Sequence, residues 1–416
     1  MPVKPELLLP AGDPEKLQYA IAYGADAVYF GLPMASLRTP SKGEQFTPTN
    51  LGRWIDYCKA HGVKAYITTN IFAGNRDIDR LIPHFEQLAD LKPDAVILSD
   101  PGVFRSARKY APNVPVHLST QANTLNVSAC AFWQDLGVER VILAREVPVR
   151  EMAEIHEQLP TLQLECFVHG SLCVAYSGRC VISDYLTDNT KNSNKGMCGN
   201  SCRWEFDVVE KTRPDQVYTM EEDEKGSYLL NSKDLCLVRY LPELQTAGIC
   251  SFKAEGRTKG VHYVATVGRV YREAIDYGAA SSEQIARWEE ELEETANRGF
   301  TEGFLHGKPG STAYTYESAQ SQSQATFVAA TEGEINADGM LKIQGRNRFM
   351  PGEDLTWMTP EGVLQSTLAE AVDERGFKTD VIQPNQWVWV MPPRGVSEET
   401  LRWALVRRKE RVPVAG

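Results

Sequence analysis

The sequence predicts a TIM-like (β/α)8 barrel followed by a small C-terminal β-barrel domain. Between residues 6 and 257, short apolar runs alternate with amphipathic helical patterns, and eight strand-like runs can be counted. Beyond residue 325 the pattern changes to short strand-like runs separated by Gly, Pro and Asn. Alternating strands and helices predict a parallel sheet, and eight such units favour a closed barrel over an open sheet.

The first strand-helix-strand unit illustrates the pattern. The apolar run 6–12 ends at Pro and Gly, Asp13-Pro14 supplies an N-cap and a proline suited to the first helical position, and AVYFGL (27–32) follows as a strand. The remaining predicted strands are 64–70, 95–100, 116–121, 140–145, 163–170 and 251–257, and the predicted helices lie near 48–61, 77–91, 102–111, 126–136, 148–158 and 235–247.

The rest of the chain predicts a closing helix, a linker and a second domain. Residues 261–278 read as the closing helix, and Ser281 with Gln284 resembles a capping box at the start of another. We expect a barrel domain over 1–307, a polar linker over 308–324 and a candidate RNA-binding β-barrel over 325–416. The positive run WALVRRKERV near the C-terminus reads either as a solvated helix face or as an RNA contact.

Composition limits the class of protein. The chain has 416 residues, is 42% hydrophobic and carries a formal net charge of -11. That charge argues against a nonspecific polyanion binder, although a local basic groove remains open. The sequence has no 18-residue apolar run, and its start lacks the order of a signal peptide, so we expect a cytoplasmic protein without a membrane span. In a reducing compartment, clustered cysteines favour metal binding or catalysis over disulfides.

Polar side chains lie where the predicted strands end. In a TIM-like barrel the chemistry sits at the carboxyl edges of the strands and in the loops that follow them. We therefore expect these side chains to converge over the barrel mouth. They are Asn70, Asp100, Ser119, Gln121, Arg145, His169, Lys253, Glu255 and Arg257.

Four of the nine cysteines lie in one stretch, residues 165–204, which follows the seventh strand. Their pattern is C-x6-C-x17-C-x3-C, formed by Cys173, Cys180, Cys198 and Cys202. The segment between them is rich in Gly, Ser and Asn, where thiols are not needed to build a core. All-thiolate ligation suits zinc or an iron–sulfur cluster, and the spacing does not distinguish them.

The other cysteines fit packing roles. Cys58 and Cys130 fall in helical patterns and Cys166 in a strand, where a buried thiol behaves as a small hydrophobe. Cys250 has the same interpretation. Cys236 begins an apolar run, which favours packing, but it stays a candidate to replace one member of the set of four.

The residues around Cys173 resemble the signature of the peptidase U32 family. The run is Glu165-x-Phe167-x-x-Gly170-Ser171-Leu172-Cys173-x6-Cys180-x-x-Ser183. KGMCGNSCRW (195–204), YLLNSKDL (228–235) and the run 253–278 further resemble the branch of that family that hydroxylates tRNA. The N-terminal run and the C-terminal β-domain fit too, so the resemblance covers most of the chain.

This resemblance implies a specific reaction. Members of the branch hydroxylate carbon 5 of the wobble uridine, position 34 of tRNA, giving 5-hydroxyuridine in a route that depends on prephenate and an iron–sulfur cluster. By motif, the ligands of a 4Fe-4S cluster carry over to Cys173, Cys180, Cys198 and Cys202. The implied partners are the tRNA anticodon loop, prephenate as co-substrate and an unidentified electron donor.

Roles follow for the strand-end residues. Arg145 and Arg257 are candidate clamps for the two carboxylates of prephenate, with Lys253 as a weaker one, because Arg suits bidentate carboxylate binding. His169 is a candidate for proton transfer because its intrinsic pKa lies near neutrality, although a histidine at a strand end is more often packed than catalytic. Glu255 joins His169 as a catalytic candidate, unless it simply pairs with Arg257.

Two further residues complete the predicted site. Gln121 and Tyr176 are assigned to substrate binding. Tyr176 and Trp204 are candidates to stack on the extruded base, or else to shield the cluster.

Two other function classes stay open. A collagenase-like U32 peptidase would use His169 with Cys173 or Ser171 as base and nucleophile, but the chain has no G-x-S-x-G elbow and no H-E-x-x-H motif. A metal-stabilised RNA-binding scaffold without chemistry fits if the metal is zinc.

Overall fold

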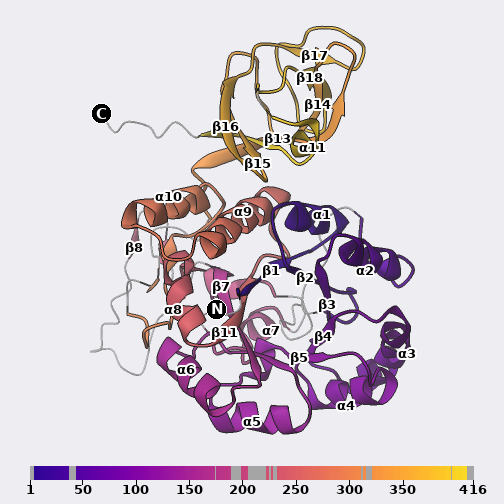
Figure 1. Cartoon of the computed structure of the whole chain (residues 1–416), viewed down its shortest axis with the longest axis vertical. Coiled ribbons are helices and arrows are strands. Elements are labelled where there is room, and N and C mark those ends of the chain that lie inside the picture. Colours follow the sequence, from indigo (N-terminus) through magenta and orange to yellow (C-terminus); the bar gives the residue numbers. More distant parts are fainter. Residues whose placement is uncertain are drawn as a thin grey trace.

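The chain folds into a TIM-like barrel and a separate antiparallel β-domain (Figure 1). The computed structural model describes residues 4–36, 44–173, 175–188, 198–204, 222–223, 226–227, 232–310, 313–314, 321–394 and 396–409. The barrel sheet ends at residue 301, and the second sheet runs from 325 to 409. The predicted fold class is confirmed, whereas part of the predicted linker, at 311–312 and 315–320, lies outside the described residues.

Eight parallel strands form the barrel in the order β11-β1-β2-β3-β4-β5-β6-β7, and β7 pairs with β11 to close it. Each corresponds to a predicted strand. Closure leaves no free edge and gathers the carboxyl ends of the strands into one ring. Their bounds are β1 (Glu6–Pro10), β2 (Ala27–Phe30), β3 (Lys64–Thr68), β4 (Ala95–Leu98), β5 (Val116–Leu118), β6 (Arg140–Ile142), β7 (Gln163–Ser171) and β11 (Ile249–Ala254).

Helices surround the barrel, and their starts follow local sequence signals. The Asp13 side chain accepts a hydrogen bond from the Lys16 N–H, and Pro14 occupies the first turn of its helix. Asp100 and Pro101 repeat this arrangement. The helices are α1 (Pro14–Ala22), α2 (Leu51–Ala60), α3 (Asn75–Leu91), α4 (Pro101–Tyr110), α5 (Val127–Asp135), α6 (Val149–Gln158), α8 (Leu241–Thr246), α9 (Val261–Tyr277) and α10 (Ser282–Glu293), with a 3-10 turn η1 (Thr120–Ala122) after β5.

The chain between β7 and β11 departs from regular alternation. It holds α7 (Ile182–Leu186), η3 (Ser201–Arg203), β8 (Glu222–Asp223), β9 (Gly226–Ser227), β10 (Asp234–Cys236) and η4 (Val238–Tyr240). The predicted helix near 235–247 is therefore wrong in its first half. β10 pairs antiparallel with the end of β7 and parallel with β12 (Phe300–Thr301). A short apolar run does not distinguish strand from helix, and the long β7 offers it a partner.

The C-terminal domain is a seven-stranded sheet in the order β16-β15-β19-β13-β14-β18-β17. The predicted helix face in the positive run near the C-terminus is wrong, because β19 forms a central strand between β15 and β13. Residues 410–412 of that run lie outside the described residues. The elements are β13 (Ala325–Ile335), β14 (Leu341–Gly345), β15 (Asp354–Thr359), β16 (Gly362–Thr367), β17 (Ala371–Asp373), β18 (Trp387–Val390), α11 (Glu398–Leu401) and β19 (Leu405–Lys409).

The C-terminal domain lies beside α1, α9 and α10 (Figure 1), and buried polar contacts join the two domains. The Tyr23 hydroxyl lies 2.8 Å from the carbonyl oxygens of both Met358 and Trp403. On β19, Arg407 is buried, and its Nε lies 2.6 Å from Oε2 of Glu294. The positive charge of Arg407 is thus neutralised by the barrel domain and does not form an RNA-binding surface.

Candidate functional site

A cavity of about 450 Å³ opens at the carboxyl ends of the barrel strands. Its lining brings together most of the predicted strand-end residues, as expected for the active face of a TIM-like barrel. From that set the lining includes Asn70, Ser119, Gln121, Arg145, Lys253, Glu255 and Arg257.

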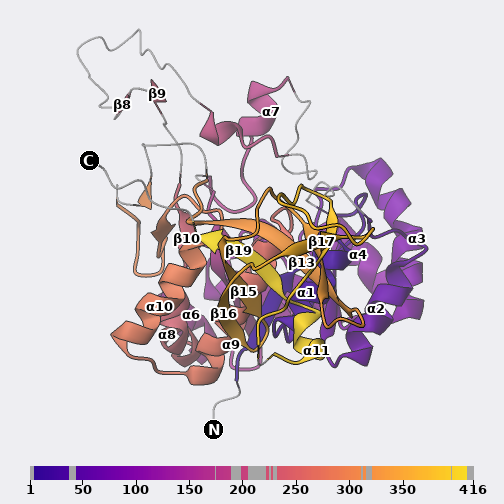
Figure 2. The ribbon, with the colours of Figure 1, turned by 90° about the horizontal axis from the view of Figure 1, so that it is seen from above.

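Above the cavity stands a small substructure that we call the cysteine lobe, made of residues 172–173, 175–188 and 198–204. Its two short helices, α7 and η3, contact each other. The Ser183 hydroxyl accepts a hydrogen bond of 3.0 Å from the Gly199 N–H, which joins the two chain segments. Figure 2 shows α7 standing clear of the barrel on its carboxyl-end side.

Two contacts attach the cysteine lobe to the barrel. The Ser177 N–H donates to Oε1 of Glu146 at 2.8 Å, and the Ser177 hydroxyl lies 3.0 Å from Oε2. At Gly178, with φ of +71°, a Cβ atom would lie only 2.1 Å from the carbonyl oxygen of Gln121. Only glycine permits this approach together with a positive φ. These contacts hold the cysteines at the cavity mouth.

All four predicted metal ligands line this cavity: Cys173, Cys180, Cys198 and Cys202. Cys180 and Cys202 are half-buried, and the other two are exposed. The Asn200 N–H donates to the sulfur of Cys198 at 3.4 Å. In the described ranges, no three or more His, Cys, Asp or Glu side chains form a group that could hold a metal ion. The four cysteines therefore share one cavity, but they do not form a group with metal-binding geometry among the described residues.

Arg145 and Glu255 form an ion pair in the cavity wall. Nη2 of Arg145 lies 3.0 Å from Oε2 of Glu255, and the guanidinium carbon lies 3.9 Å from the centre of the Phe167 ring. Both charged side chains are largely buried. Stacking on an aromatic ring holds a guanidinium in one plane. In that orientation its N–H groups can donate to a planar anion such as a carboxylate. The sequence-level alternative, a pairing of Glu255 with Arg257, is not the one observed.

Lys253 lies at the cavity floor, where it pairs with a carboxylate inside the barrel. Its Nζ is 3.0 Å from Oε1 of Glu165, and the Tyr29 ring centre lies 4.4 Å away. Burial lowers the pKa of Lys253, and the negative charge of Glu165 opposes that lowering. The position of the Lys253 ammonium group is therefore fixed by Glu165, inside the barrel.

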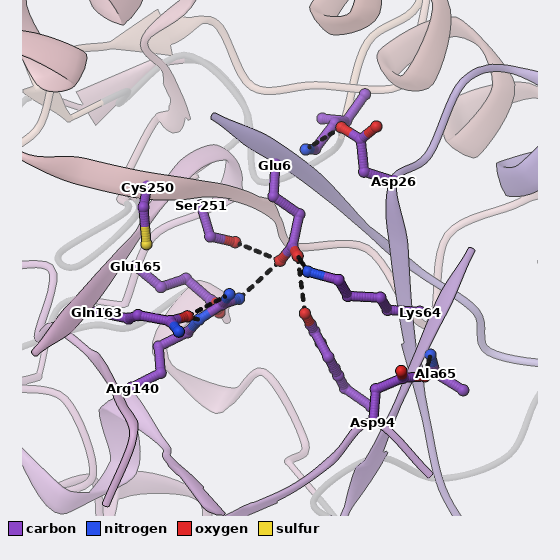
Figure 3. A network of polar contacts seen from close by, with 12 residues as sticks. Glu6, Asp26, Lys64, Ala65, Asp94, Arg140, Gln163, Glu165, Cys250 and Ser251 are labelled. Atoms are coloured by element: carbon purple, nitrogen blue, oxygen red, sulfur yellow. Dashed lines mark hydrogen bonds and ion pairs between the residues drawn. The ribbon is translucent and has the colours of Figure 1, made fainter. Parts of the chain in front are cut away.

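Glu165 belongs to a larger buried network, drawn in Figure 3. Nη1 of Arg140 bridges Oε2 of Glu165 at 3.0 Å and Oε1 of Glu6 at 2.6 Å. Glu6 also accepts hydrogen bonds from Tyr66 and Ser251. Burial opposes ionisation of Glu6, but the charge of Arg140 and its hydrogen bond keep the Glu6 pKa below its ordinary value. The barrel interior is thus charged yet internally neutralised.

The remaining predicted binding residues also reach the cavity. Nη1 of Arg257 donates to Oγ1 of Thr68 at 3.0 Å and to the Ser36 hydroxyl, so the guanidinium is fixed by the last residue of β3 and by a residue in the loop after β2. Gln121 is half-buried, whereas Tyr176 is 62% exposed. Gln121 therefore lies in the wall and Tyr176 at the rim.

His169 does not line the cavity. Its ring is 1% exposed and packs against Tyr263, Tyr271 and Phe300, with Nδ1 3.3 Å from the Tyr271 hydroxyl. Burial lowers the pKa of His169 to about 3. The predicted proton-transfer role is therefore not supported.

A register shift explains the position of His169. Lys253 and Ala254 are consecutive on β11, but their partners on β7 are Phe167 and His169. One extra residue on β7 reverses which face the following side chain takes. His169 thus packs against tyrosines of α9, although simple alternation from Phe167 would direct it inward.

The structure adds cationic residues that were not predicted. Lys259 and Arg298 also line the cavity, so its lining holds five Lys or Arg residues and two Glu residues, Glu146 and Glu255. Lys259 lies in the loop after β11. A search of the loops that follow the strands, and not of the strand ends alone, would have predicted it. Arg298 comes after α10 and pairs with Asp234, a contact without a local sequence signal. The lining thus has more cationic than anionic side chains, although Arg145, Lys253 and Arg298 each pair with a carboxylate.

Sequence profiles match both domains. The profile described as Peptidase family U32 matches residues 12–315, and that of the Peptidase family U32 C-terminal domain matches residues 323–407. The chain belongs to peptidase family U32.

Several similar proteins carry names connected with RNA. The chain is 36% identical to "tRNA hydroxylation protein P" of Haemophilus influenzae, covering 97% of this chain and 96% of that one. It is 38% identical to "tRNA hydroxylation protein P1" of Bacillus subtilis, covering 91% and 89%. It is also 31% identical to "23S rRNA 5-hydroxycytidine C2501 synthase" of Escherichia coli, covering 82% of this chain and 48% of that one.

Among the described helices of this U32 protein, none has the length and apolar character needed to cross a membrane.

Proposed function

We propose that this U32 protein is a tRNA hydroxylase that acts on carbon 5 of wobble uridine 34 and depends on prephenate. One observation carries the proposal: four cysteines and five cationic side chains line a single cavity at the catalytic face of the barrel. The names of the relatives support hydroxylation of an RNA base. The uridine position and the co-substrate rest on the family resemblance.

The cofactor we propose is a 4Fe-4S cluster held by Cys173, Cys180, Cys198 and Cys202. Four thiols on one lobe match the ligand chemistry of such clusters. Because metal binding is coupled to folding, four thiols that line one cavity fit a site whose final geometry forms with its cofactor. When bound, the cluster would supply one-electron transfer at the barrel mouth, with electrons from an external donor, while the oxygen donor, prephenate or dioxygen, would be the oxidant that hydroxylation of carbon 5 requires.

The cationic wall fits a dicarboxylate such as prephenate. Arg145 presents a planar guanidinium held by Phe167 and Glu255, and Arg257 presents a second one held by hydroxyl groups. Lys253 adds a fixed ammonium group beneath them. We assign one carboxylate to each arginine because paired N–H donors match carboxylate geometry.

The uridine would enter beside these groups. The wobble base is unpaired in a free anticodon loop, so its extrusion costs less than flipping a base from a duplex. We assign Gln121, in the cavity wall, to hydrogen bonds with the edge of the base, and Tyr176, at the rim, to stacking on the face of the base. Glu255, in place of His169, is the candidate to accept the proton that leaves carbon 5.

Two measurements test this function. The protein, purified without oxygen, should contain iron and sulfide and absorb visible light, whereas a colourless protein with only zinc would contradict the redox chemistry. Mass spectrometry of tRNA nucleosides from a strain lacking the protein should show loss of 5-hydroxyuridine derivatives. Restoration by the wild-type gene, but not by a Cys180→Ser gene, is the control for indirect effects.

The peptidase alternative has less structural support. The described cavity lining contains no histidine, and the predicted base, His169, is buried among aromatic rings. Cys173 therefore lacks a histidine to activate it within that lining. The metal-stabilised scaffold alternative would be supported by the zinc outcome above.

A further inference from the structure

Exposed apolar side chains are concentrated on the cysteine lobe. Tyr185 is 82% exposed, Val181 64%, Tyr176 62%, Trp204 44% and Leu186 38%. Single exposed apolar residues are ordinary, but a cluster on one small substructure marks an interaction surface. Three of the five are aromatic, and aromatic rings are the side chains on which nucleobases stack.

These residues adjoin the cavity. Tyr176 lines it directly, and Cys180, next to Val181, lines it too. Tyr185 lies on α7, and Trp204 follows η3, the turn that α7 contacts. The segments that carry these exposed aromatic residues therefore adjoin the cavity, on the side where α7 stands clear of the barrel (Figure 2).

The position decides which occupant fits. If the cavity takes an extruded base, the neighbouring nucleotides of the same loop must pass over the rim, and their faces are then unstacked. An apolar aromatic rim recovers the stacking that those bases lose. The exposed Arg179 and the cationic cavity below add attraction for the sugar–phosphate chain.

We propose that Tyr185 and Trp204 form a stacking platform for the unpaired nucleotides that flank the target base. This inference rests on the proposed function, since it takes the substrate to be a single-stranded RNA loop. In this proposal the cysteine lobe carries the four thiols and also binds the RNA. RNA binding and the redox site therefore lie on the same substructure.

Binding of an anticodon stem-loop RNA to the full-length, anaerobically purified protein tests the platform. Tyr185→Ala and Trp204→Ala should each weaken binding roughly tenfold, the scale of one lost base–aromatic stack. Tyr185→Phe should bind as the wild type does, because the ring is kept. The matched control is Phe132→Ala on α5, a residue 57% exposed but on a different element.

Photo-crosslinking of the wild-type protein gives a second readout, which does not depend on whether a variant folds. The same RNA with 5-iodouridine at the positions flanking the wobble base should crosslink to peptides containing Tyr185 or Trp204. Crosslinks only to other peptides, together with unchanged binding by the Tyr185→Ala/Trp204→Ala double variant, would overturn the proposal.

The outcomes separate this inference from the proposed function. If the double variant binds RNA normally but is no longer reduced by a protein electron donor, the surface serves that partner instead and the platform is rejected. If the wild type modifies tRNA while the variants bind normally, only the platform fails. If the wild type neither binds nor modifies the RNA, the proposed function fails as well.

Discussion

Glu165 and Lys253 form an ion pair inside the barrel, with Oε1 and Nζ 3.0 Å apart and the Glu165 side chain fully buried. The pair connects the cavity floor to the network of Glu6 and Arg140. Charges buried in a barrel are stable only when each has its partner. The cavity floor therefore depends on Glu165, Glu6 and Arg140, which lie outside the cavity lining.

Glu165→Gln should lower the free energy of unfolding by about 3–5 kcal/mol, because it leaves Lys253 without its buried countercharge and leaves Arg140 with Glu6 alone. Denaturant unfolding measures this loss. Glu283→Gln, which removes an ion pair between two exposed side chains, is the control and should leave stability unchanged within error. Equal effects of the two substitutions would show that the buried network contributes nothing special.

Arg145→Lys should raise the prephenate concentration needed for half-maximal hydroxylation by about tenfold, since lysine keeps the charge but not the paired donors or the stacking on Phe167. The measurement is initial rate against prephenate concentration with tRNA saturating. Arg150→Lys, at a side chain 80% exposed, should leave that concentration unchanged. An unaltered value for Arg145→Lys would remove it from the carboxylate site.

Serine substitution of Cys173, Cys180, Cys198 or Cys202 should abolish visible absorption and iron content, because thiolates hold the proposed cluster. Cys236→Ser should keep both. Cys236 is buried near the Tyr271 hydroxyl, with sulfur and oxygen 3.8 Å apart, and does not line the cavity. Iron loss in Cys236→Ser, with iron kept in one of the four variants, would reassign that ligand.

Buried histidines should make the protein less stable in acid. Burial lowers the pKa of His169 and of His262 from 6.5 to about 3. Between these values the unfolded chain binds protons that the folded chain does not, so stability is constant above pH 6.5 and falls as the pH drops below it. Each group contributes a limiting slope of about 1.4 kcal/mol per pH unit.

His169→Gln should reduce the slope of the free energy of unfolding against pH by up to about 1.4 kcal/mol per pH unit, the contribution of one histidine. Unfolding curves between pH 5 and pH 7 measure the change. The pH profile of the hydroxylation rate should keep its shape in the variant, since the ring lies outside the cavity lining. Loss of one limb of the rate profile would instead restore a catalytic role to His169.

The barrel could be predicted closely because its signals are local. Asp13-Pro14 and Asp100-Pro101 mark helix starts, and runs such as AVYF alternate with them at regular spacing. The same rule failed at Cys236, where a short apolar run became β10 because a neighbouring strand was available to pair with it. Arg407 was misread for the same reason, since its strand partners are distant in sequence.

The sequence by itself determined the fold class, the strand ends that meet at the barrel mouth and the lobe that carries the four thiols, because periodicity, caps and cysteine spacing are local properties. Only the tertiary structure decided which polar residues face the cavity. One extra residue on β7 placed His169 among aromatic rings, while Glu165, in a strand that reads as apolar, became the partner of Lys253. Side-chain direction at a strand end depends on pairing register, which is fixed by residues far away in the chain.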